Sequence, residues 1–425
     1  MSLRLQRAEL ISFIVIAGFF FSVCFHYAMH FYLHRAYPYS TFLSWPTDRL
    51  SDYGRVADAA KSGDPYRYRI PAFHGPGGEV GNYLPFTYMA AMLFSIGHHG
   101  VFLFLSLFLA GLAWYLYHQS GIRTDPQITP LAKVRIVFVL ALMSYPVLWE
   151  LDRGNFEALT FLLMAAGAAL IGRGKYSLGA VPLALAIAMK GYPAIFLALF
   201  LPVRRYREAA LSVVIAVVVC LVGFSVWRGG LTQSIHSFQA DLAFFLDYYV
   251  FKGAGAAGAR MDCSPFAVLG LLNSNPRFIR HALPYYDGLA LLSGALLLWL
   301  VLARKMECWK LEYLLAAAGL LLTPVSYDYK LLVLFIPLAS FLNSARRERA
   351  DAFFCASFGV MLIPKDYLFI GNAVSVANGV SISSLIEPLL LLATVALIVR
   401  EVLTARQPTG TRRSKRSRWG RMGDS

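Results

Sequence analysis

The sequence has little charge for its length, which excludes an ordinary soluble protein. Only 15% of its 425 residues are charged, while 58% are hydrophobic, and a soluble domain carries about a quarter charged residues. Apolar runs long enough to cross a ~30 Å hydrocarbon core recur along the chain. Because helices and closed barrels alone satisfy backbone polar groups inside a bilayer, we expect an all-α, polytopic transmembrane protein with about 11–13 membrane helices.

Several familiar motifs are also absent, and each absence argues against a class of function. The sequence has no P-loop, no glycine-rich dinucleotide fingerprint and no G-x-S-x-G elbow in a credible context, which disfavours ATP-driven transport and serine hydrolysis. No internal repeat is evident, which counts against a secondary transporter. The five cysteines form neither a disulfide framework nor a CxxC pair. We therefore expect no cofactor and no bound metal, although the sequence leaves a divalent-metal requirement open.

The net charge of +15 reflects membrane topology rather than nucleic-acid binding. Basic residues cluster in short loops between apolar runs and in the C-terminal tail, where the positive-inside rule places cytoplasmic segments. We predict one integral membrane unit over residues 1–404 in the inner (plasma) membrane, with both termini cytoplasmic. Residues 405–425 are predicted to form a disordered basic tail that contacts anionic membrane lipids, and no nucleic-acid partner is expected.

Some apolar runs are too short to cross a membrane alone, and their breaks place polar residues on the external side. Residues 177–203 are interrupted by Lys190-Gly191-Tyr192-Pro193, which predicts two short helices or a re-entrant element lining a cavity. The predicted topology puts this break outside, together with the first loop (34–83) and a long loop (228–283). The long loop is expected to cover the site or to select the acceptor.

Carboxylates are concentrated directly after the first apolar run. Four aspartates stand beside arginines and tyrosines within residues 41–69. A carboxylate at the membrane edge suits a sugar transferase, since it can take a proton from an acceptor hydroxyl while a lipid-linked donor stays in the bilayer. We select Asp52 first and Asp48 second as catalytic bases; in a helix they would share one face. Alternatively, Asp48 or Ser51 caps a helix that begins near Ser51.

Three cations are candidates for binding the phosphate of such a donor. Lys190 lies inside an apolar run, where an ionisable residue is costly and suggests function, with snorkelling as the alternative. Lys330, in TPVSYDYKLL, and Arg153, in LDRGNFEAL, are the other two candidates and could instead be interface anchors.

A further set of polar and aromatic residues could form the substrate pocket, since aromatic faces suit pyranose rings. The candidates are Tyr53, Tyr66, Tyr83, Asn155, Glu157, Ser326, Tyr327 and Tyr329. Some of the tyrosines could be residues of the interfacial aromatic belt. Asn155 and Glu157 could serve only as the N-terminal cap of the helix that follows them.

The order of several motifs resembles a known family. In chain order they are SDYGRVADAAKSGDPY, Tyr83-Leu84-Pro85, Gly154-Asn155-Phe156-Glu157, the run AMKGYP that contains Lys190, and the run TPVSYDY that begins at Thr323. Together, over most of residues 10–345, they resemble glycosyltransferase family 87, the GT-C-type membrane mannosyltransferases that use polyprenyl-phosphate sugars.

The resemblance implies a GT-C architecture with an external catalytic loop after the first helix. It further implies an inverting transfer, without a covalent sugar–enzyme intermediate, from a polyprenyl-phosphate sugar to a lipid or glycan acceptor. By the family's spacing, Asp48 fits the position of the loop aspartate better than Asp52. The turn here reads GNFE where the family more usually has a GQ-type sequence.

Three other functions compete with this interpretation. A lipid-linked oligosaccharide flippase or other transporter would spread its essential residues along helices, whereas a transferase would concentrate them in residues 41–69. A polysaccharide polymerase is also polytopic with external loops. A non-catalytic assembly subunit would tolerate the loss of both Asp48 and Asp52.

Overall fold

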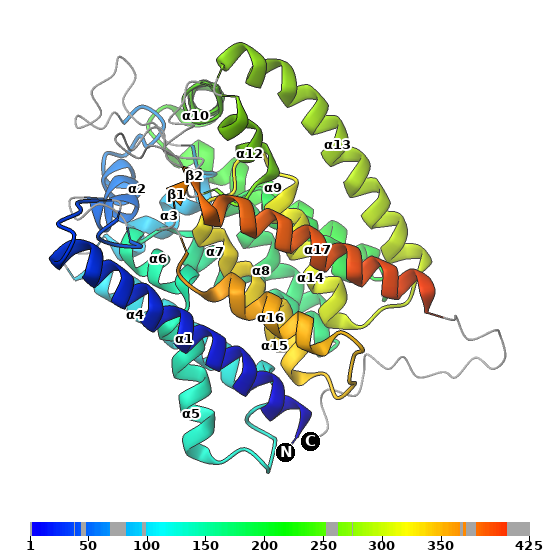
Figure 1. The fold of residues 1–425 in the computed structure, drawn as a ribbon. Coiled ribbons are helices and arrows are strands. Elements are labelled where there is room, and N and C mark those ends of the chain that lie inside the picture. Colours follow the sequence, from blue (N-terminus) through cyan, green and yellow to red (C-terminus); the bar gives the residue numbers. More distant parts are fainter. Residues whose placement is uncertain are drawn as a thin grey trace.

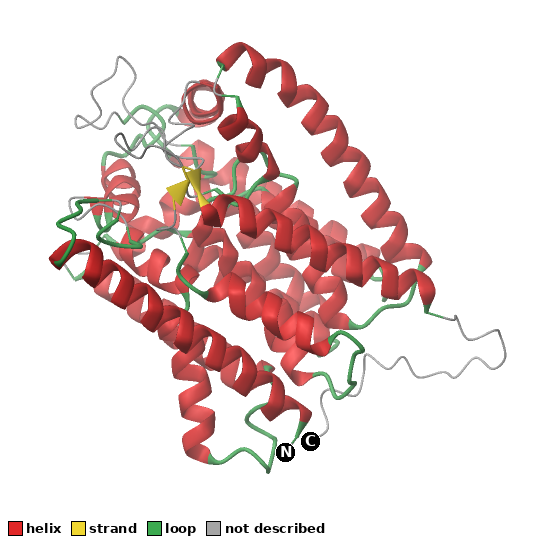
Figure 2. Ribbon diagram, in the orientation of Figure 1, coloured by secondary structure: helices red, strands yellow, loops and turns green. Residues whose placement is uncertain are grey.

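The computed structural model describes most of the chain, and helices dominate the described part (Figure 2). The described residues are 2–37, 39–43, 48–68, 82–95, 99–251, 262–273, 275–365, 369–370 and 380–405. Two short strands, β1 (Phe369–Ile370) and β2 (Val380–Ser381), pair antiparallel. The predicted all-α, polytopic membrane architecture is confirmed. The predicted tail lies outside the described residues except for Ala405.

In the described part of the chain, four helices are long and apolar enough to cross a membrane. They are α1 (Leu3–Phe31), α4 (Gly100–Gln119), α9 (Tyr206–Val226) and α13 (Pro276–Ala303). A fifth candidate is the bent pair Pro130–Met143 and Tyr145–Arg153, whose two parts meet at 52°. This pair contains α5 (Pro130–Phe138), the π-helix η2 (Val139–Met143) and α6 (Tyr145–Arg153). The bend falls where Ser144 is extended and Pro146 opens α6, because proline cannot continue the preceding helix.

Shorter helices fill the interior between these spans. They are α3 (Pro85–Phe94), α7 (Glu157–Gly172), α8 (Tyr176–Met189), η3 (Tyr192–Phe200), α14 (Cys308–Leu321), η5 (Asp328–Leu334), α15 (Phe335–Asn343) and α16 (Asp351–Leu362). The longer helix α17 (Ile382–Thr404) packs against α14 and α16. Helices α7 and α8 pack tightly because Gly167 and Gly179 face each other; a Cβ on Gly179 would lie 3.0 Å from the Gly167 carbonyl oxygen. The α14 helix is buried along nearly its whole length.

The break at Lys190 is present as predicted, between two short helices. The α8 helix ends at Met189, Lys190 is extended (φ −145°, ψ 129°), and the 3₁₀ helix η3 begins at Tyr192 with Pro193 in its first turn. The two pieces pack against each other. The chain thus turns at this point and exposes polar backbone where it can line a site.

The remaining short elements gather at one end of the bundle (Figure 1). They are α2 (Ser51–Lys61), α10 (Gly230–Phe245), the π-helix η4 (Leu246–Phe251), α12 (Pro265–Leu272) and the β1–β2 hairpin. The opposite end holds the start of α1 and of α5 (Figure 1). Several basic clusters meet there, as Arg7 pairs with Asp351 at 2.8 Å and Arg135 pairs with Glu9. The helix α2, which carries Asp52, and these basic clusters therefore lie at opposite ends of the helix bundle.

Candidate active site

A backbone contact fixes the start of α2 beside the end of α6. Leu50, the residue before α2, adopts the left-handed conformation (φ 56°, ψ 15°), and its N–H donates to the Asp152 carbonyl at 2.6 Å. No side chain caps the helix at Leu50. The capping alternative for Asp48 and Ser51 is therefore wrong, because a left-handed residue, rather than a polar cap, begins this helix.

Asp52 is held by two donors that reach it from the α6–α7 turn. Arg153 Nη2 pairs with Asp52 Oδ1, and Asn155 Nδ2 donates to Asp52 Oδ2 at 2.8 Å. The Asp52 side chain is 14% exposed. Burial acts to raise its pKa, but Arg153, Asn155 and Arg55 outweigh burial and hold the pKa of this carboxyl below its ordinary value. Asp52 is therefore an oriented, ionised carboxylate.

Asp48 shares the same arginine and is the more accessible of the two carboxylates. Its Oδ2 pairs with Arg153 Nη1, and its Oδ1 accepts from Arg55 Nη2 at 3.3 Å. The Asp48 side chain is 37% exposed. Arg153 thus bridges both predicted bases and is not a simple interface anchor.

Lys190 is bound inside the protein. Its Nζ donates to Asn155 Oδ1 at 2.9 Å and to Glu157 Oε2 at 2.7 Å, and its side chain is 11% exposed. Snorkelling is therefore wrong for Lys190. Glu157 is fully buried and also accepts from the Tyr192 hydroxyl, so it serves as the partner of Lys190 rather than as a helix cap. Asn155 Oδ1 does accept from the Glu157 N–H at 3.0 Å, in the manner of a cap.

Aromatic rings lie beside both lysine ammonium groups. Lys190 Nζ lies 5.1 Å from the ring centres of both Tyr83 and Tyr329, and Lys330 Nζ lies 5.3 Å from that of Tyr192. Cations over aromatic faces are stabilised by the ring quadrupole. The Tyr83 hydroxyl accepts from Asn155 Nδ2 at 3.2 Å, which connects this tyrosine to the Asp52 side of the network.

Lys330 is anchored to the turn that precedes η5. It donates to the Val325 carbonyl at 2.8 Å and lies 3.4 Å from Ser326 Oγ. Asp262, buried in the long loop, accepts from the Ser326 N–H at 2.9 Å. Burial raises the pKa of Asp262 to about 6, although the donors from Ser264 and Ser326 oppose the rise. The loop after α10 is thereby tied to the lysine-bearing turn.

The remaining predicted pocket residues lie at different depths. The backbone of Tyr327 forms an isolated antiparallel β-bridge with that of Asp262. The ring of Tyr327 lies 5.8 Å from that of Tyr329. The Tyr53 hydroxyl donates to the Phe94 carbonyl at 2.5 Å, and its ring stacks on Phe156. Tyr53 therefore supports α2 from behind the carboxylates.

Tyr66 lies in the packing under α3. It is fully buried between Tyr88, Phe224 and Phe238, and its hydroxyl donates to the Tyr83 carbonyl. It thus holds the backbone of Tyr83, and its ring contacts among the described residues are with α3, α9 and α10 rather than with Asp52 or Asp48.

Three residues of the network were missed by sequence reasoning, and the first of them is Arg55, which binds Asp48. Tyr192, which binds Glu157, was seen only as part of the Gly-Tyr-Pro break, although its position two residues after Lys190 was a usable signal. Asp262 stands 64 residues before the Ser326 N–H that it binds, and nothing local in the sequence indicates this contact.

One group in the described part of the chain has atoms close enough to hold a metal ion. Ligand atoms of Cys263, Asp328 and Glu387 lie within 4.8 Å of one another, all buried. However, Lys365 Nζ lies 2.6 Å from Glu387 Oε1, and the Tyr145 hydroxyl donates to Asp328 Oδ2 at 2.9 Å. Because Lys365 already pairs with one of its two carboxylates and Tyr145 donates to the other, we assign no metal to this cluster.

Comparison with known proteins identifies the family of this arrangement. The model of the family described as Glycosyltransferase family 87 matches residues 82–326, a range that includes Arg153, Asn155, Lys190 and Ser326 but not the two aspartates of α2 and its approach. No curated protein and no solved structure matches the chain.

Proposed function

The chain belongs to glycosyltransferase family 87 and is a membrane glycosyltransferase; from this premise we propose which reaction the charged network performs. The proposed reaction transfers a hexose from a polyprenyl-phosphate donor to a hydroxyl of a lipid or glycan acceptor. Mannose as the sugar rests on analogy with the family. The proposed architecture is GT-C, with the site on the external face of the plasma membrane and both termini in the cytoplasm.

One observation carries this proposal. Asn155 binds a carboxylate with one end of its amide and an ammonium group with the other, since Nδ2 donates to Asp52 at 2.8 Å and Oδ1 accepts from Lys190 at 2.9 Å. The side chain of Asn155 thus holds a carboxylate from α2 and an ammonium group from the end of α8 next to each other. Such a pair suits a reaction in which a hydroxyl loses a proton while a neighbouring phosphate gains charge.

The proposed mechanism is a single inverting displacement. The acceptor oxygen bonds to the anomeric carbon of the donor as the bond from that carbon to the phosphate oxygen breaks. The hydroxyl proton passes to Asp52, with Asp48 as the alternative base, and the electron pair leaves with the polyprenyl phosphate. Lys190, Lys330 and Arg153 stabilise the departing phosphate, and Tyr83, Tyr327 and Tyr329 contact the sugar.

The proposal is tested by sugar transfer with purified protein in nanodiscs. Radiolabelled polyprenyl-phosphate mannose is supplied with an envelope-lipid and glycan extract as the acceptor pool. We expect wild type to label a new product and Asp52→Asn to lose about 10²–10⁴-fold in rate, as is typical when a general base is removed. Asp58→Asn is the matched control, because Asp58 lies exposed on the same helix.

The possible outcomes test the assignment of the base and the proposed donor class separately. If Asp48→Asn is inactive and Asp52→Asn is not, Asp48 is the base. Full activity in both variants contradicts an aspartate base in this loop. Failure of wild type to transfer label from any lipid-linked donor contradicts the proposed donor class.

A further inference from the structure

Three cations gather at the basic end of the helices, where α4 ends and α5 begins (Figure 1). Arg123 Nη1 lies 3.0 Å from His118 Nδ1, and Lys133 Nζ donates to the Arg123 carbonyl at 2.7 Å. Arg173, which directly follows α7, acts electrostatically on His118 together with Arg123. We call Arg123, Lys133 and Arg173 the cation cluster; three separate segments bring its charges to the end of α4.

The cation cluster has no acidic counterpart in the described part of the chain. No described carboxylate forms an ion pair with any of its three residues, whereas Arg135 on α5 pairs with Glu9. Asp125, two residues after Arg123, is buried, and its Oδ1 accepts from the Gln127 N–H at 2.9 Å. Like charges that gather without a counterion repel one another. An anion bound among them would relieve this repulsion.

The side of α4 that leads to the cluster is apolar and exposed. Leu103, Leu107 and Trp114 are all exposed, and their spacing of four and seven residues places them on one face of the helix. The ring of His118, which continues this face, lies 4.8 Å from the ring of Trp114. Because tryptophan favours the boundary between hydrocarbon and headgroups, we infer that the cluster lies at headgroup level with hydrocarbon beside α4.

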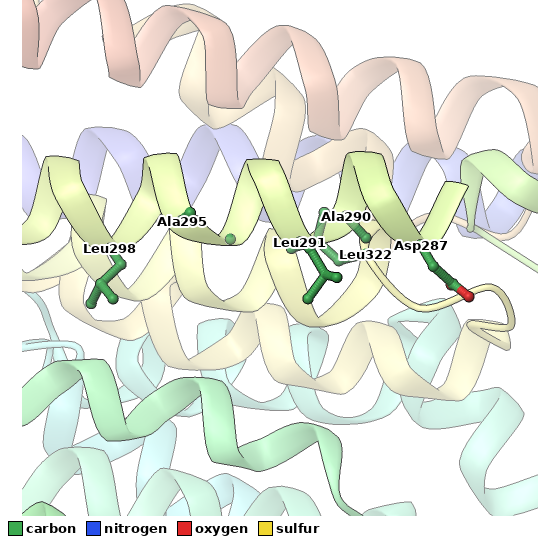
Figure 3. Close-up of a pocket in the computed structure, with 7 residues that line it drawn as sticks. Asp287, Ala290, Leu291, Ala295, Leu298 and Leu322 are labelled. Carbon is green, nitrogen blue, oxygen red and sulfur yellow. The ribbon is translucent and has the colours of Figure 1, made fainter. Parts of the chain in front are cut away.

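A second apolar surface, along α13, carries charge of the opposite sign. Figure 3 shows Leu291 and Leu298 extending from one side of α13, with Asp287 at the end of the row. The rest of this groove is lined by Ala290, Gly294, Ala295 and Leu322. Its lining thus contains a carboxylate and no cation, so an anionic headgroup placed there would be repelled. Charge distinguishes the α4 face from this groove.

We propose that the cation cluster and the adjoining face of α4 bind an anionic phospholipid. The headgroup phosphate would lie between Arg123 and Arg173, with an acyl chain along Trp114 and Leu107. Guanidinium N–H groups match phosphate oxygens in pairs, and basic pockets between membrane helices are typical sites for anionic headgroups. A zwitterionic phospholipid would bring its own cation into the cluster. The site lies at the opposite end of the helices from Asp52 and does not depend on the proposed reaction.

The proposal is tested by native mass spectrometry of purified protein titrated with phosphatidylglycerol or with phosphatidylcholine of the same acyl chains. We expect wild type to bind one phosphatidylglycerol about tenfold more tightly than phosphatidylcholine. Arg123→Gln/Arg173→Gln should weaken phosphatidylglycerol binding about tenfold, equivalent to about 1.4 kcal/mol, and leave phosphatidylcholine binding unchanged. A wild type that binds both lipids equally would overturn the site.

The matched control is Arg207→Gln/Lys305→Gln, which removes the same charge from other exposed positions. All four substituted residues are exposed, so both variants should fold, and circular dichroism checks this. The control should keep the preference for phosphatidylglycerol. An equal loss of preference in the control would reflect general attraction between a basic protein and anionic lipid, and would overturn the site.

A competition experiment distinguishes a lipid from a free phosphate. Glycerophosphate has the same phosphate chemistry but no acyl chains. We expect it to leave phosphatidylglycerol bound to wild type at equal concentration, because the apolar face of α4 contributes nothing to its binding. Displacement of the lipid by glycerophosphate would overturn the lipid as occupant and leave a simple anion site.

Discussion

Two charged networks at different ends of the helices use arginine and carboxylate in different ways. At the end that holds the start of α1, Arg7 is 2% exposed. It binds both oxygens of Asp351 and the carbonyls of Phe341, Ser344 and Arg346. These five bonds use every N–H of a guanidinium group. At the other end, Arg153 holds Asp52 and Asp48, and the Asp48 side chain is 37% exposed.

The contrast separates a structural ion pair from a candidate reactive one. Arg7 joins the end of α15 to the start of α16 through main-chain carbonyls, so its value lies in holding helices together. Arg153 instead positions two loop carboxylates beside a lysine bound by aromatic rings. Buried charge is common to both networks, and Asp351 and Asp52 are equally exposed, at 14%. The second network differs in its more exposed Asp48 and in the lysine that Asn155 holds beside Asp52. The predictions below test this distinction from the largest expected effect to the smallest.

The largest effect is expected from Arg7→Met, and on stability rather than on reaction. The change leaves Asp351 and the carbonyls at the end of α15 without their donor; breaking a buried ion pair typically costs about 3–5 kcal/mol. Thermal unfolding in nanodiscs, followed by circular dichroism, should show a clearly lower Tm, while the folded fraction keeps its specific transfer rate. Arg4→Met, which removes one bond of 3.3 Å to Asn343, is the milder control. Loss of transfer activity in folded Arg7→Met would contradict a purely structural role for the Arg7 network.

A smaller effect is expected from Glu157→Gln, on binding of the donor. Glu157 is a positioning residue, because it is fully buried and acts through Lys190 and Tyr192. A neutral amide cannot hold the ammonium group as firmly, so KM for the donor should rise about tenfold, equivalent to about 1.4 kcal/mol, with kcat less affected. Tyr192→Phe, which removes one hydroxyl from Glu157, should have a weaker effect in steady-state kinetics. A lower folded yield with unchanged KM would make Glu157 purely structural.

The smallest effect is expected from Arg55→Met, on the pH profile. Arg55 lies 4.0 Å from Asp52 and helps to lower the pKa of that carboxyl. Its removal should move the acid limb of kcat/KM to higher pH by less than about one unit, since a partly exposed pair is worth about 1 kcal/mol or less. In wild type this limb should lie below the ordinary aspartate range.

The same shift has a consequence for stability with a defined sign. Because the folded-state pKa of Asp52 is lowered, its ion pair stabilises the fold above the unfolded pKa, and this contribution is lost as pH falls through the folded pKa. If the acid limb of kcat/KM instead lies near pH 6 and does not move in Arg55→Met, the titrating group is Asp262, since burial raises the pKa of Asp262 to about 6. Removal of that limb by Asp262→Asn would separate the two carboxyls.

The sequence predicted the all-α membrane architecture, while the roles of the predicted site residues stay predictions. Apolar periodicity and length located most segments and the break at Lys190, because both are local properties. Pairing between distant segments could not be derived in this way. Arg153 and Asp48 are 105 residues apart, and Lys190 and Glu157 are 33 apart; the pattern of a single sequence does not determine such contacts. The capping alternative at Ser51 was wrong because Leu50, in the left-handed conformation, occupies the N-cap position. Its backbone N–H bonds to the Asp152 carbonyl.

The shortness of α8 has a consequence for the surrounding membrane. The helix has 14 residues, which span about 21 Å at about 1.5 Å per residue, compared with a hydrocarbon thickness of about 30 Å. It begins just after the basic turn at Lys175 and ends at Lys190, so the proposed chemistry takes place below the level of the opposite headgroups. The remaining depth must be filled by neighbouring protein, since α8 packs against α7, α9 and η3, or be met by local thinning of the bilayer. Transfer rates in nanodiscs of different lipid chain length should therefore depend on membrane thickness.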